Sequence, residues 1–140
     1  MGWLVSERAC EGRVLVVDDE EPIRRTVGLV LKNAGYDVME AADGGKAIEV
    51  LNSGDNPMMV DTIICDIRMP KIDGVEAISY FRSQYPSIPV IVLTGYPDAD
   101  LSSSLMKDGV VEYLVKPVGR EKLLGAVSGA IKRRKISFYP

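Results

Sequence analysis

Four short runs of apolar, mostly β-branched residues are the feature that most constrains the fold of this chain. They lie at Val14 to Val17, Thr62 to Cys65, Val90 to Leu93 and, interrupted by Glu112, Val110 to Val115. Most are continuous rather than alternating with polar residues, which is typical of parallel strands that helices cover on both faces. A weaker run from Asp37 to Ala41 supplies a fifth strand.

Segments with helical periodicity separate these runs. We expect helices from about Pro22 to Gly35, from Asp43 as N-cap to Asn52, from Val75 to Tyr85, from Asp98 to Lys107, and from Arg120 to Arg134. The stretch Ser53 to Val60 is expected to be a polar loop. Because strand and helix alternate five times, right-handed crossovers predict one α/β domain with a doubly wound, five-stranded parallel sheet. This (βα)5 arrangement is of the flavodoxin-like type, with strand order 2-1-3-4-5.

Length and charge bound the remaining possibilities. A chain of 140 residues with 46% hydrophobic residues can bury one ordinary core, so we expect a folded domain over 13–134 and tails at 1–12 and 135–140. The formal charge of -3 offers no global attraction to nucleic acid or to an anionic membrane. No apolar stretch approaches the roughly 18 residues of a membrane helix, and Cys10 and Cys65 have no metal-ligand spacing. A cytoplasmic protein is therefore expected.

Polar side chains directly follow the four strong strands. Asp18 and Asp19 follow the first, Asp66 the third, Thr94 the fourth and Lys116 the fifth. In open α/β sheets the carboxyl ends of the strands line the crevice where ligands bind, so these side chains should converge. Clustered carboxylates repel one another, and a hard divalent cation such as Mg²⁺ relieves that repulsion.

A site of this composition suits phosphoryl transfer to a carboxylate. A metal ion, a lysine ammonium and a hydroxyl would position and neutralise the transferring oxygens, with Asp66 as the nucleophile. Seen alone, an Asp pair after a strand is usually a cap or turn feature, and a strand-end Thr or Lys-Pro is equally ordinary. Their joint occurrence favours the functional interpretation. Because the chain contains no histidine, a phosphohistidine donor would have to be another protein.

Four motifs carry a resemblance to a known family. Val16-Val17-Asp18-Asp19-Glu20, Asp66-Ile67-Arg68-Met69-Pro70 through Asp73-Gly74, Leu93-Thr94-Gly95 and Tyr113-Leu114-Val115-Lys116-Pro117 occur in that order. Over about residues 13 to 134 the chain resembles the receiver domains of bacterial two-component response regulators. Any one motif would be weak evidence, whereas four in order at the family's spacing are specific.

The resemblance implies a role for each matching residue. Asp66 is the implied phosphoacceptor, Lys116 pairs with a phosphoryl oxygen, and Thr94 and the aromatic Tyr113 form the switch. Mg²⁺, or Mn²⁺ in its place, would be bound by Asp19, Asp66 and the backbone carbonyl of Arg68, with Asp18 acting through water. Lys116-Pro117 is similar to a cis peptide of the family, although sequence does not determine the isomer.

The resemblance also implies partners. A sensor histidine kinase or phosphotransfer protein would donate the phosphoryl group, and an output domain or protein would read the face formed by the fourth helix, fifth strand and fifth helix. The chain would catalyse only its own phosphorylation and dephosphorylation. We expect a monomer or weak dimer, because Gly109 to Glu112 lacks an acidic pair typical of one dimerising subgroup. We expect no direct nucleic-acid contact, because Lys132 to Lys135 fits a basic last helical turn.

Three other functions compete with this one. A degenerate receiver would act only as a protein-interaction module, but the acidic residues, hydroxyl and lysine are all present. A small aspartate-nucleophile phosphotransferase of the haloacid-dehalogenase type would need a DxD motif, where this chain has Asp18-Asp19. A flavodoxin-type cofactor protein would need a phosphate-binding loop after the first strand, and no such loop is evident.

Overall fold

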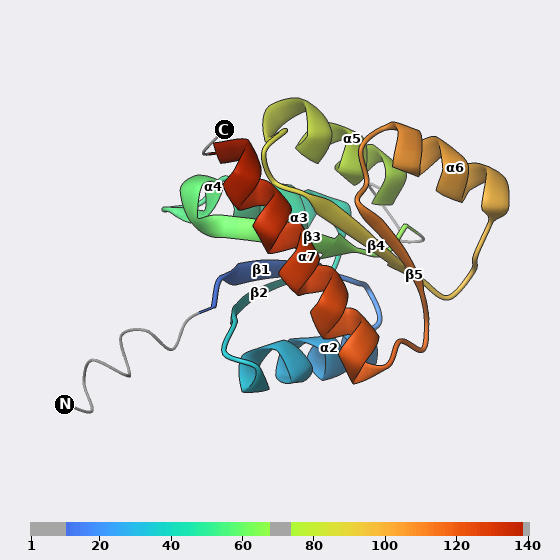
Figure 1. The fold of residues 1–140 in the computed structure, drawn as a ribbon, viewed down its shortest axis with the longest axis horizontal. Coiled ribbons are helices and arrows are strands. Elements are labelled where there is room, and N and C mark those ends of the chain that lie inside the picture. The colour runs from blue at the N-terminus through green and yellow to red at the C-terminus, as the bar shows by residue number, and fades with distance from the viewer. Residues whose placement is uncertain (1–10, 68–73, 139–140) are drawn as a thin grey trace.

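Five parallel strands form the centre of the molecule (Figure 1). The computed structural model describes residues 11–67 and 74–138, with side chains as far as Arg134. The strands are β1 (Arg13–Val17), β2 (Asp37–Ala41), β3 (Val60–Cys65), β4 (Val90–Thr94) and β5 (Glu112–Val115). Their order in the sheet is β2-β1-β3-β4-β5, and all neighbouring pairs are parallel. The predicted fold class and strand order are confirmed.

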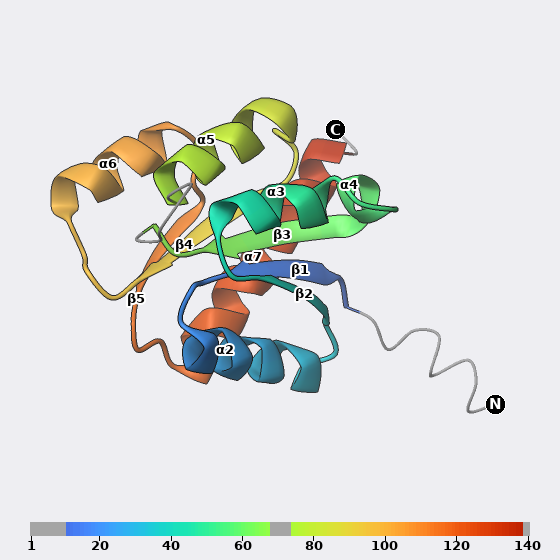
Figure 2. The same ribbon diagram turned by 180° about the vertical axis from the view of Figure 1, so that it is seen from behind.

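Helices cover both faces of this sheet, as the two opposite views show (Figures 1 and 2). They are α2 (Glu21–Asn33), α3 (Gly44–Leu51), the short α4 (Asn56–Met59), α5 (Gly74–Gln84), α6 (Ala99–Lys107) and α7 (Arg120–Phe138). Side chains of α2 and α7 pack into one buried cluster, and side chains of α3, α5 and α6 pack into the other.

The two buried clusters explain why the central strands carry continuous apolar runs. Along β1, Val14 and Val16 point into the α2 and α7 cluster, whereas Leu15 and Val17 point into the opposite one. Successive strand side chains face opposite sides of a sheet, so a strand covered on both sides must be apolar throughout. Polar residues begin where the apolar runs of the central strands end, although Asp18, Asp66 and Thr94 are still buried.

Helix boundaries follow local signals in several places. The Asp43 carboxylate accepts a hydrogen bond from the Lys46 amide at 2.8 Å and caps α3, as expected from the sequence. Asp98 caps α6 in the same way, accepting from the Leu101 amide at 3.0 Å. A side-chain oxygen at this position satisfies one of the amides that a helix start leaves without a partner.

The structure differs from the sequence-based expectation at the start of β5. The strand begins at Glu112 and not at Val110, although Val110 is buried. Gly109, with φ of 104°, ends the α6 segment, and the Val110 amide donates to the Leu105 carbonyl at 3.1 Å. Because that amide closes the end of the helix, it is not available to a strand ladder.

Two helices also depart from the expectation. The stretch predicted as the loop Ser53 to Val60 contains α4, and β3 already starts at Val60. The buried Asn56 side chain holds this segment, since it donates to the Val50 carbonyl at 2.8 Å. Helix α7 continues to Phe138, so residues 135–138 of the expected tail are helical.

Candidate functional site

The carboxyl ends of four strands bring the predicted site residues to one edge of the sheet. Asp18 follows β1, Asp66 follows β3, Thr94 ends β4 and Lys116 follows β5. The Lys116 ammonium lies 2.9 Å from Oδ2 of Asp66 and 2.8 Å from Oδ2 of Asp18. Residues separated by up to a hundred positions thus meet around one cation, as parallel strand geometry requires.

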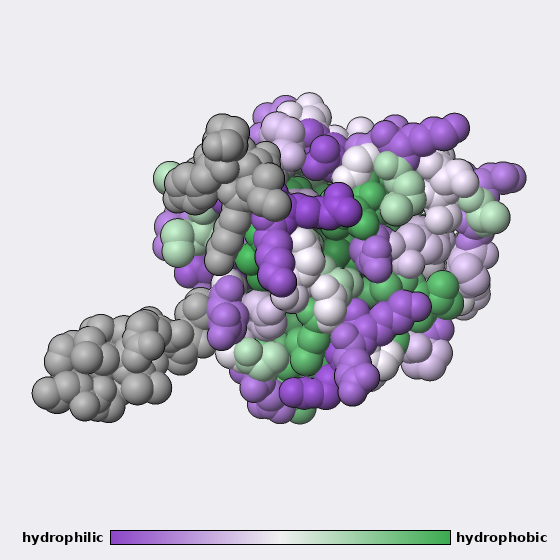
Figure 3. Space-filling model, viewed as in Figure 1, coloured by the Kyte–Doolittle hydropathy of each residue, from purple (hydrophilic) through white to green (hydrophobic). Residues whose placement is uncertain are grey.

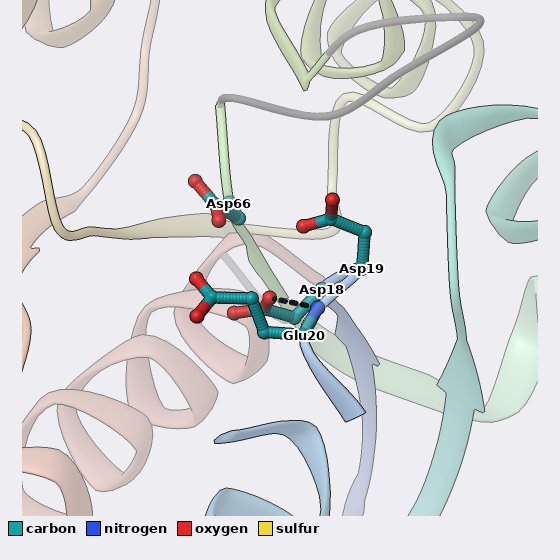
Figure 4. Close-up of side chains that lie close together, drawn as sticks. All are labelled: Asp18, Asp19, Glu20 and Asp66. Carbon is teal, nitrogen blue, oxygen red and sulfur yellow. Dashed lines mark hydrogen bonds between the residues drawn. The ribbon is translucent and has the colours of Figure 1, made fainter. Parts of the chain in front are cut away.

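Four carboxylates lie close together at this edge of the sheet (Figure 4). Asp18, Asp19, Glu20 and Asp66 each offer an oxygen, and these oxygens all lie within 4.8 Å of one another. Glu20 also lies 3.1 Å from the Lys116 ammonium. The sequence-based site did not give Glu20 a role. The signal that could have found it is its position as the third consecutive acid after β1.

The cluster fits a hard divalent cation. Its donors are carboxylate oxygens, which Mg²⁺ and Mn²⁺ prefer, and the two exposed members, Asp19 and Glu20, give an ion access from solvent. Asp18 and Asp66 are buried. Arg68, whose backbone carbonyl was expected to be a ligand, lies outside the described residues.

Burial and charge act in opposite directions on these groups. Burial raises the pKa of Asp18, and the nearby Asp66 adds to that rise, against the lowering effect of Lys116. Burial would lower the pKa of Lys116, but hydrogen bonds to Asp18 and Asp66 outweigh burial, so its pKa is raised. The lysine therefore stays protonated. Four carboxylates share one ammonium at this site, an excess of acidic over basic groups that favours binding of a cation.

Backbone hydrogen bonds fix the strand ends that carry the site. The Asp18 amide donates to the Ala41 carbonyl at 3.1 Å, and the Asp66 amide donates to the Val17 carbonyl at 3.0 Å. The Lys116 amide donates to the Thr94 carbonyl at 2.8 Å, and the Lys116-Pro117 peptide that follows is cis. The sheet ladder thus continues into the site residues themselves.

The two expected switch residues both contact the connection between β4 and α6. Thr94 is fully buried, and its hydroxyl oxygen accepts a hydrogen bond from the Tyr96 amide at 3.1 Å. The half-buried Tyr113 accepts from the Asp98 amide at 3.4 Å. A change at either hydroxyl would therefore reach the loop that leads into α6.

Comparisons with known proteins agree with this geometry. Residues 14–128 match the model of the response regulator receiver domain. The chain is 33% identical over 127 residues to the transcriptional regulatory protein ZraR of Klebsiella oxytoca, and 34% identical over 124 residues to the response regulator MprA of Mycobacterium ulcerans. The alignments cover 91% and 89% of this chain, but only 28% of ZraR and 52% of MprA.

Solved structures show the same likeness. A response regulator receiver domain protein from Clostridium thermocellum superposes with a TM-score of 0.83 at 33% identity, covering 89% of this chain and 98% of that one. A response regulator receiver protein from Pseudomonas putida gives a TM-score of 0.78 at 32% identity, covering 84% and 96%.

The described helices include none with the length and apolar character needed to cross a membrane.

The matched region, 14–128, contains every strand-end residue of the site and lies within the predicted folded region, 13–134. The fold, the site composition and the family match agree, and the chain belongs to the response regulator receiver domain family, a family of two-component signalling domains.

Proposed function

We propose that this chain accepts a phosphoryl group on Asp66, in a reaction that depends on Mg²⁺ and for which Mn²⁺ can substitute. The observation that carries the proposal is the ammonium of Lys116, 2.9 Å from an Asp66 oxygen inside a cluster of four carboxylates. A nucleophilic carboxylate, a cation for the phosphoryl oxygens and oxygen ligands for a metal are the parts that such a transfer needs.

Each residue then has a distinct part in the reaction. An Asp66 carboxylate oxygen forms the new bond to phosphorus while the bond from phosphorus to the donor's imidazole nitrogen breaks, and the electron pair stays on that nitrogen. Lys116 pairs with a phosphoryl oxygen in place of Asp66. Asp18, Asp19 and Asp66 would hold the metal, with Glu20 as a further carboxylate and the Arg68 carbonyl as the expected backbone ligand. The metal would neutralise charge that builds up on the transferring oxygens.

The donor histidine lies outside this sequence in the proposal, because the 140 residues contain no histidine. A groove of about 490 Å³ lies beside the site and is lined by Lys116, by Ile23 and Val27 of α2, and by Pro117 and Val118. Hydrophobic side chains reach the surface between α7 and α2 (Figure 3). We infer that a histidine kinase or phosphotransfer protein docks on this groove, since its imidazole must come within bonding distance of Asp66.

The output of the proposed reaction is a change of surface. In the structure, the Thr94 hydroxyl accepts a hydrogen bond from the Tyr96 amide, in the loop before α6. A phosphoryl group on Asp66 would offer that hydroxyl a new acceptor to which it can donate. We infer that the α6, β5 and α7 face changes and is read by an output domain or protein, and that the chain acts in the cytoplasm as a monomer or weak dimer. Direct binding of nucleic acid is not part of the proposal. One relative, the CAI-1 autoinducer sensor kinase/phosphatase CqsS of Vibrio cholerae, is named as a kinase, and this chain covers 17% of it.

Incubation with Mg²⁺ and acetyl phosphate, followed by peptide mass spectrometry, tests the proposal. We expect one added phosphoryl group on Asp66, no modification without the metal, and none in Asp66→Asn. Asp100→Asn, which alters an exposed carboxylate on α6, is the matched control and should be modified normally. If Asp66→Asn were modified as fast as the wild type, the phosphoacceptor would be another residue. If the wild type with Mg²⁺ were not modified at all, a protein-interaction module would be the better description.

A further inference from the structure

The carboxylate of Asp19 differs from its three acidic neighbours in its contacts with the described residues. Asp18 and Glu20 both bond to Lys116, and Asp66 does so as well. Within 11–67 and the described part of the chain after residue 73, the Asp19 side chain has no hydrogen bond or ion pair, and no dashed line reaches it in Figure 4. In the described part of the chain, the bonds that restrain Asp19 are therefore those of the backbone on either side of it.

That backbone is held from behind by Arg24. The Arg24 Nη1 atom donates to the backbone carbonyl of Asp18 at 2.7 Å, and its Nε atom donates to the Glu40 carboxylate on β2 at 3.1 Å. Only 15% of the Arg24 side chain is exposed. Hydrogen bonds from a charged donor are short and about twice as strong as neutral ones, and this one is shielded from water.

The bond to the Asp18 carbonyl also orients Asp19. The Asp18 carbonyl and the Asp19 amide and Cα belong to one planar peptide unit, so fixing the oxygen fixes the plane. The other parts of Asp18 are also bound, through its amide to Ala41 and through its carboxylate to the Glu20 amide at 2.9 Å. The Glu20 amide belongs to the next peptide unit, so bonds hold the peptide planes on both sides of Asp19, and together they restrain the direction of its Cα–Cβ bond.

We propose that Arg24 is a positioning residue of the acidic site, which acts through the Asp18-Asp19 peptide to aim the Asp19 carboxylate at the divalent cation. This inference rests on the proposed metal-dependent function and adds to it a residue that does not contact the ion. Groups behind the ligands of a metal commonly change its affinity by about 10- to 100-fold when they are removed.

An arginine is required because two acceptors lie in different directions. The planar guanidinium presents Nε and Nη1 at a fixed angle, and here the two atoms bond to Glu40 and to the Asp18 carbonyl. A lysine ammonium is a single point of charge and cannot hold both acceptors in the same geometry. Glu40 neutralises the charge of the largely buried arginine and fixes the orientation of its guanidinium group.

The neighbouring Arg25 provides a matched control. It lies on the same helix and forms an ion pair with Glu21 at 3.1 Å, but its side chain is 75% exposed and that pair lies on the helix surface. Exposed pairs of this kind contribute little to stability. Arg25→Lys therefore makes the same chemical change as Arg24→Lys without touching the Asp18 carbonyl.

The test is titration of the full chain with Mn²⁺, following the free ion by electron paramagnetic resonance in the absence of any phosphodonor. We expect Arg24→Lys to bind Mn²⁺ about tenfold more weakly than the wild type, Glu40→Gln to show a smaller loss, and Arg25→Lys to bind normally. Thermal unfolding without metal shows whether each variant is folded. A folded Arg24→Lys protein that binds Mn²⁺ as tightly as Arg25→Lys would overturn the proposal.

A second comparison separates positioning from general loosening of the site. In an Asp19→Asn background the carboxylate that Arg24 aims is gone, so Arg24→Lys should cost little further affinity, a strong departure from additivity. An undiminished loss in that background would also overturn the proposal. The proposed phosphorylation of Asp66 does not depend on either result. It has its own test: the proposal would be wrong if wild-type protein that binds Mn²⁺ were not modified by acetyl phosphate. A wild-type chain that binds no Mn²⁺ would remove the metal site and this inference with it.

Discussion

At the scale of single residues, close packing behind the site is as specific as the charges in it. Gly74 begins α5 directly beside the strand end that carries Asp66. A Cβ atom at this position would overlap the Asp66 carbonyl oxygen and the Ile67 Cα, both of which are backbone atoms. Backbone cannot rotate away as a side chain can, so the absence of a side chain at residue 74 allows α5 to approach the phosphoacceptor.

Gly74→Ala is therefore expected to destabilise the chain by about 1–3 kcal/mol, the usual cost of forcing extra atoms into a packed site. It should also slow phosphorylation of Asp66, because the strand end must move. Urea unfolding and the rate of labelling by acetyl phosphate measure the two effects. Gly129→Ala is the control, because residue 129 lies in α7 and the added Cβ atom would meet open space. This variant should be more stable than the wild type by about 0.5–1 kcal/mol, since alanine has a higher helix propensity than glycine. Equal stability of the two variants would contradict this account.

At the scale of elements, two arginines fasten the edge of the sheet opposite the site. Arg13 of β1 donates to Asp37 of β2 and to Asp55 and Asn56 at the start of α4, at 2.8 to 2.9 Å. Helix α4 is too short to be stable by itself, so these bonds from a strand hold it in place.

Arg134 joins α7 to the same region. It is buried, bonds to Asp61 of β3 at 3.3 Å, and donates to the Met58 carbonyl at 3.0 Å. The basic run Lys132 to Lys135 was expected to be the last helical turn, but α7 continues to Phe138, so the run lies before the end of the helix. Arg134 is buried in these contacts, whereas Lys132 and Arg133 are exposed. These contacts anchor the C-terminal part of α7 to β3 and to α4.

The Arg13 and Asp55 pair predicts a dependence of stability on pH. The hydrogen bond from Arg13 lowers the pKa of Asp55 below its ordinary value of 3.8. A lowered pKa in the folded state adds stability above the unfolded pKa and loses it as pH falls through the folded one. Wild type should thus resist urea better than Asp55→Asn at pH 7, by a small margin because Asp55 is exposed. The margin should shrink below pH 3.8, whereas any difference shown by Asp100→Asn should stay constant. A margin that grew in acid would reverse the sign and refute this account.

At the scale of the whole molecule, chemistry and structural anchoring occupy opposite edges of one sheet. The acidic cluster lies at the carboxyl ends of the strands, and the ion pairs of Arg13 and Arg134 lie at the amino ends of β1 and β3. The proposed signal must leave the site without loosening that anchored edge. Thr94 and Tyr113 lie on the two strands nearest α6, and both bond to the loop that precedes it.

Thr94→Ala tests this route across the molecule. We expect Asp66 still to be phosphorylated, but the accompanying shifts of backbone amide resonances in α6 to be reduced at least by half, because the hydroxyl that links the site to the Tyr96 amide is absent. The variant should lose about 0.5–1.5 kcal/mol of stability, since the hydrogen bond from the Tyr96 amide to the Thr94 hydroxyl is lost. Thr94→Ser keeps the hydroxyl and should retain the α6 response. If the amide shifts in α6 were equal in Thr94→Ala and wild type, the signal would take another path.

The sequence by itself determined the strands, the helical segments and which strand ends carry chemistry. Continuous apolar runs can be buried only between two layers of helices, and parallel strands must bring their carboxyl ends to one edge. For that reason Asp18, Asp66, Thr94 and Lys116 could be placed at one edge before any coordinates. Their assigned roles, and the division into a domain and two tails, stay predictions.

Only the tertiary structure decided the features that depend on contacts between distant segments. The start of β5 depends on the α6 carbonyl that accepts a hydrogen bond from the Val110 amide. Helix α4 depends on hydrogen bonds from Arg13, which lies in β1. The bond from Arg24 to the Asp18 carbonyl and the fit of Gly74 against Asp66 are equally invisible in a pattern of residue types. Hydrophobic periodicity indicates which residues are buried. Which groups form hydrogen bonds or pack together depends on where folding brings each segment.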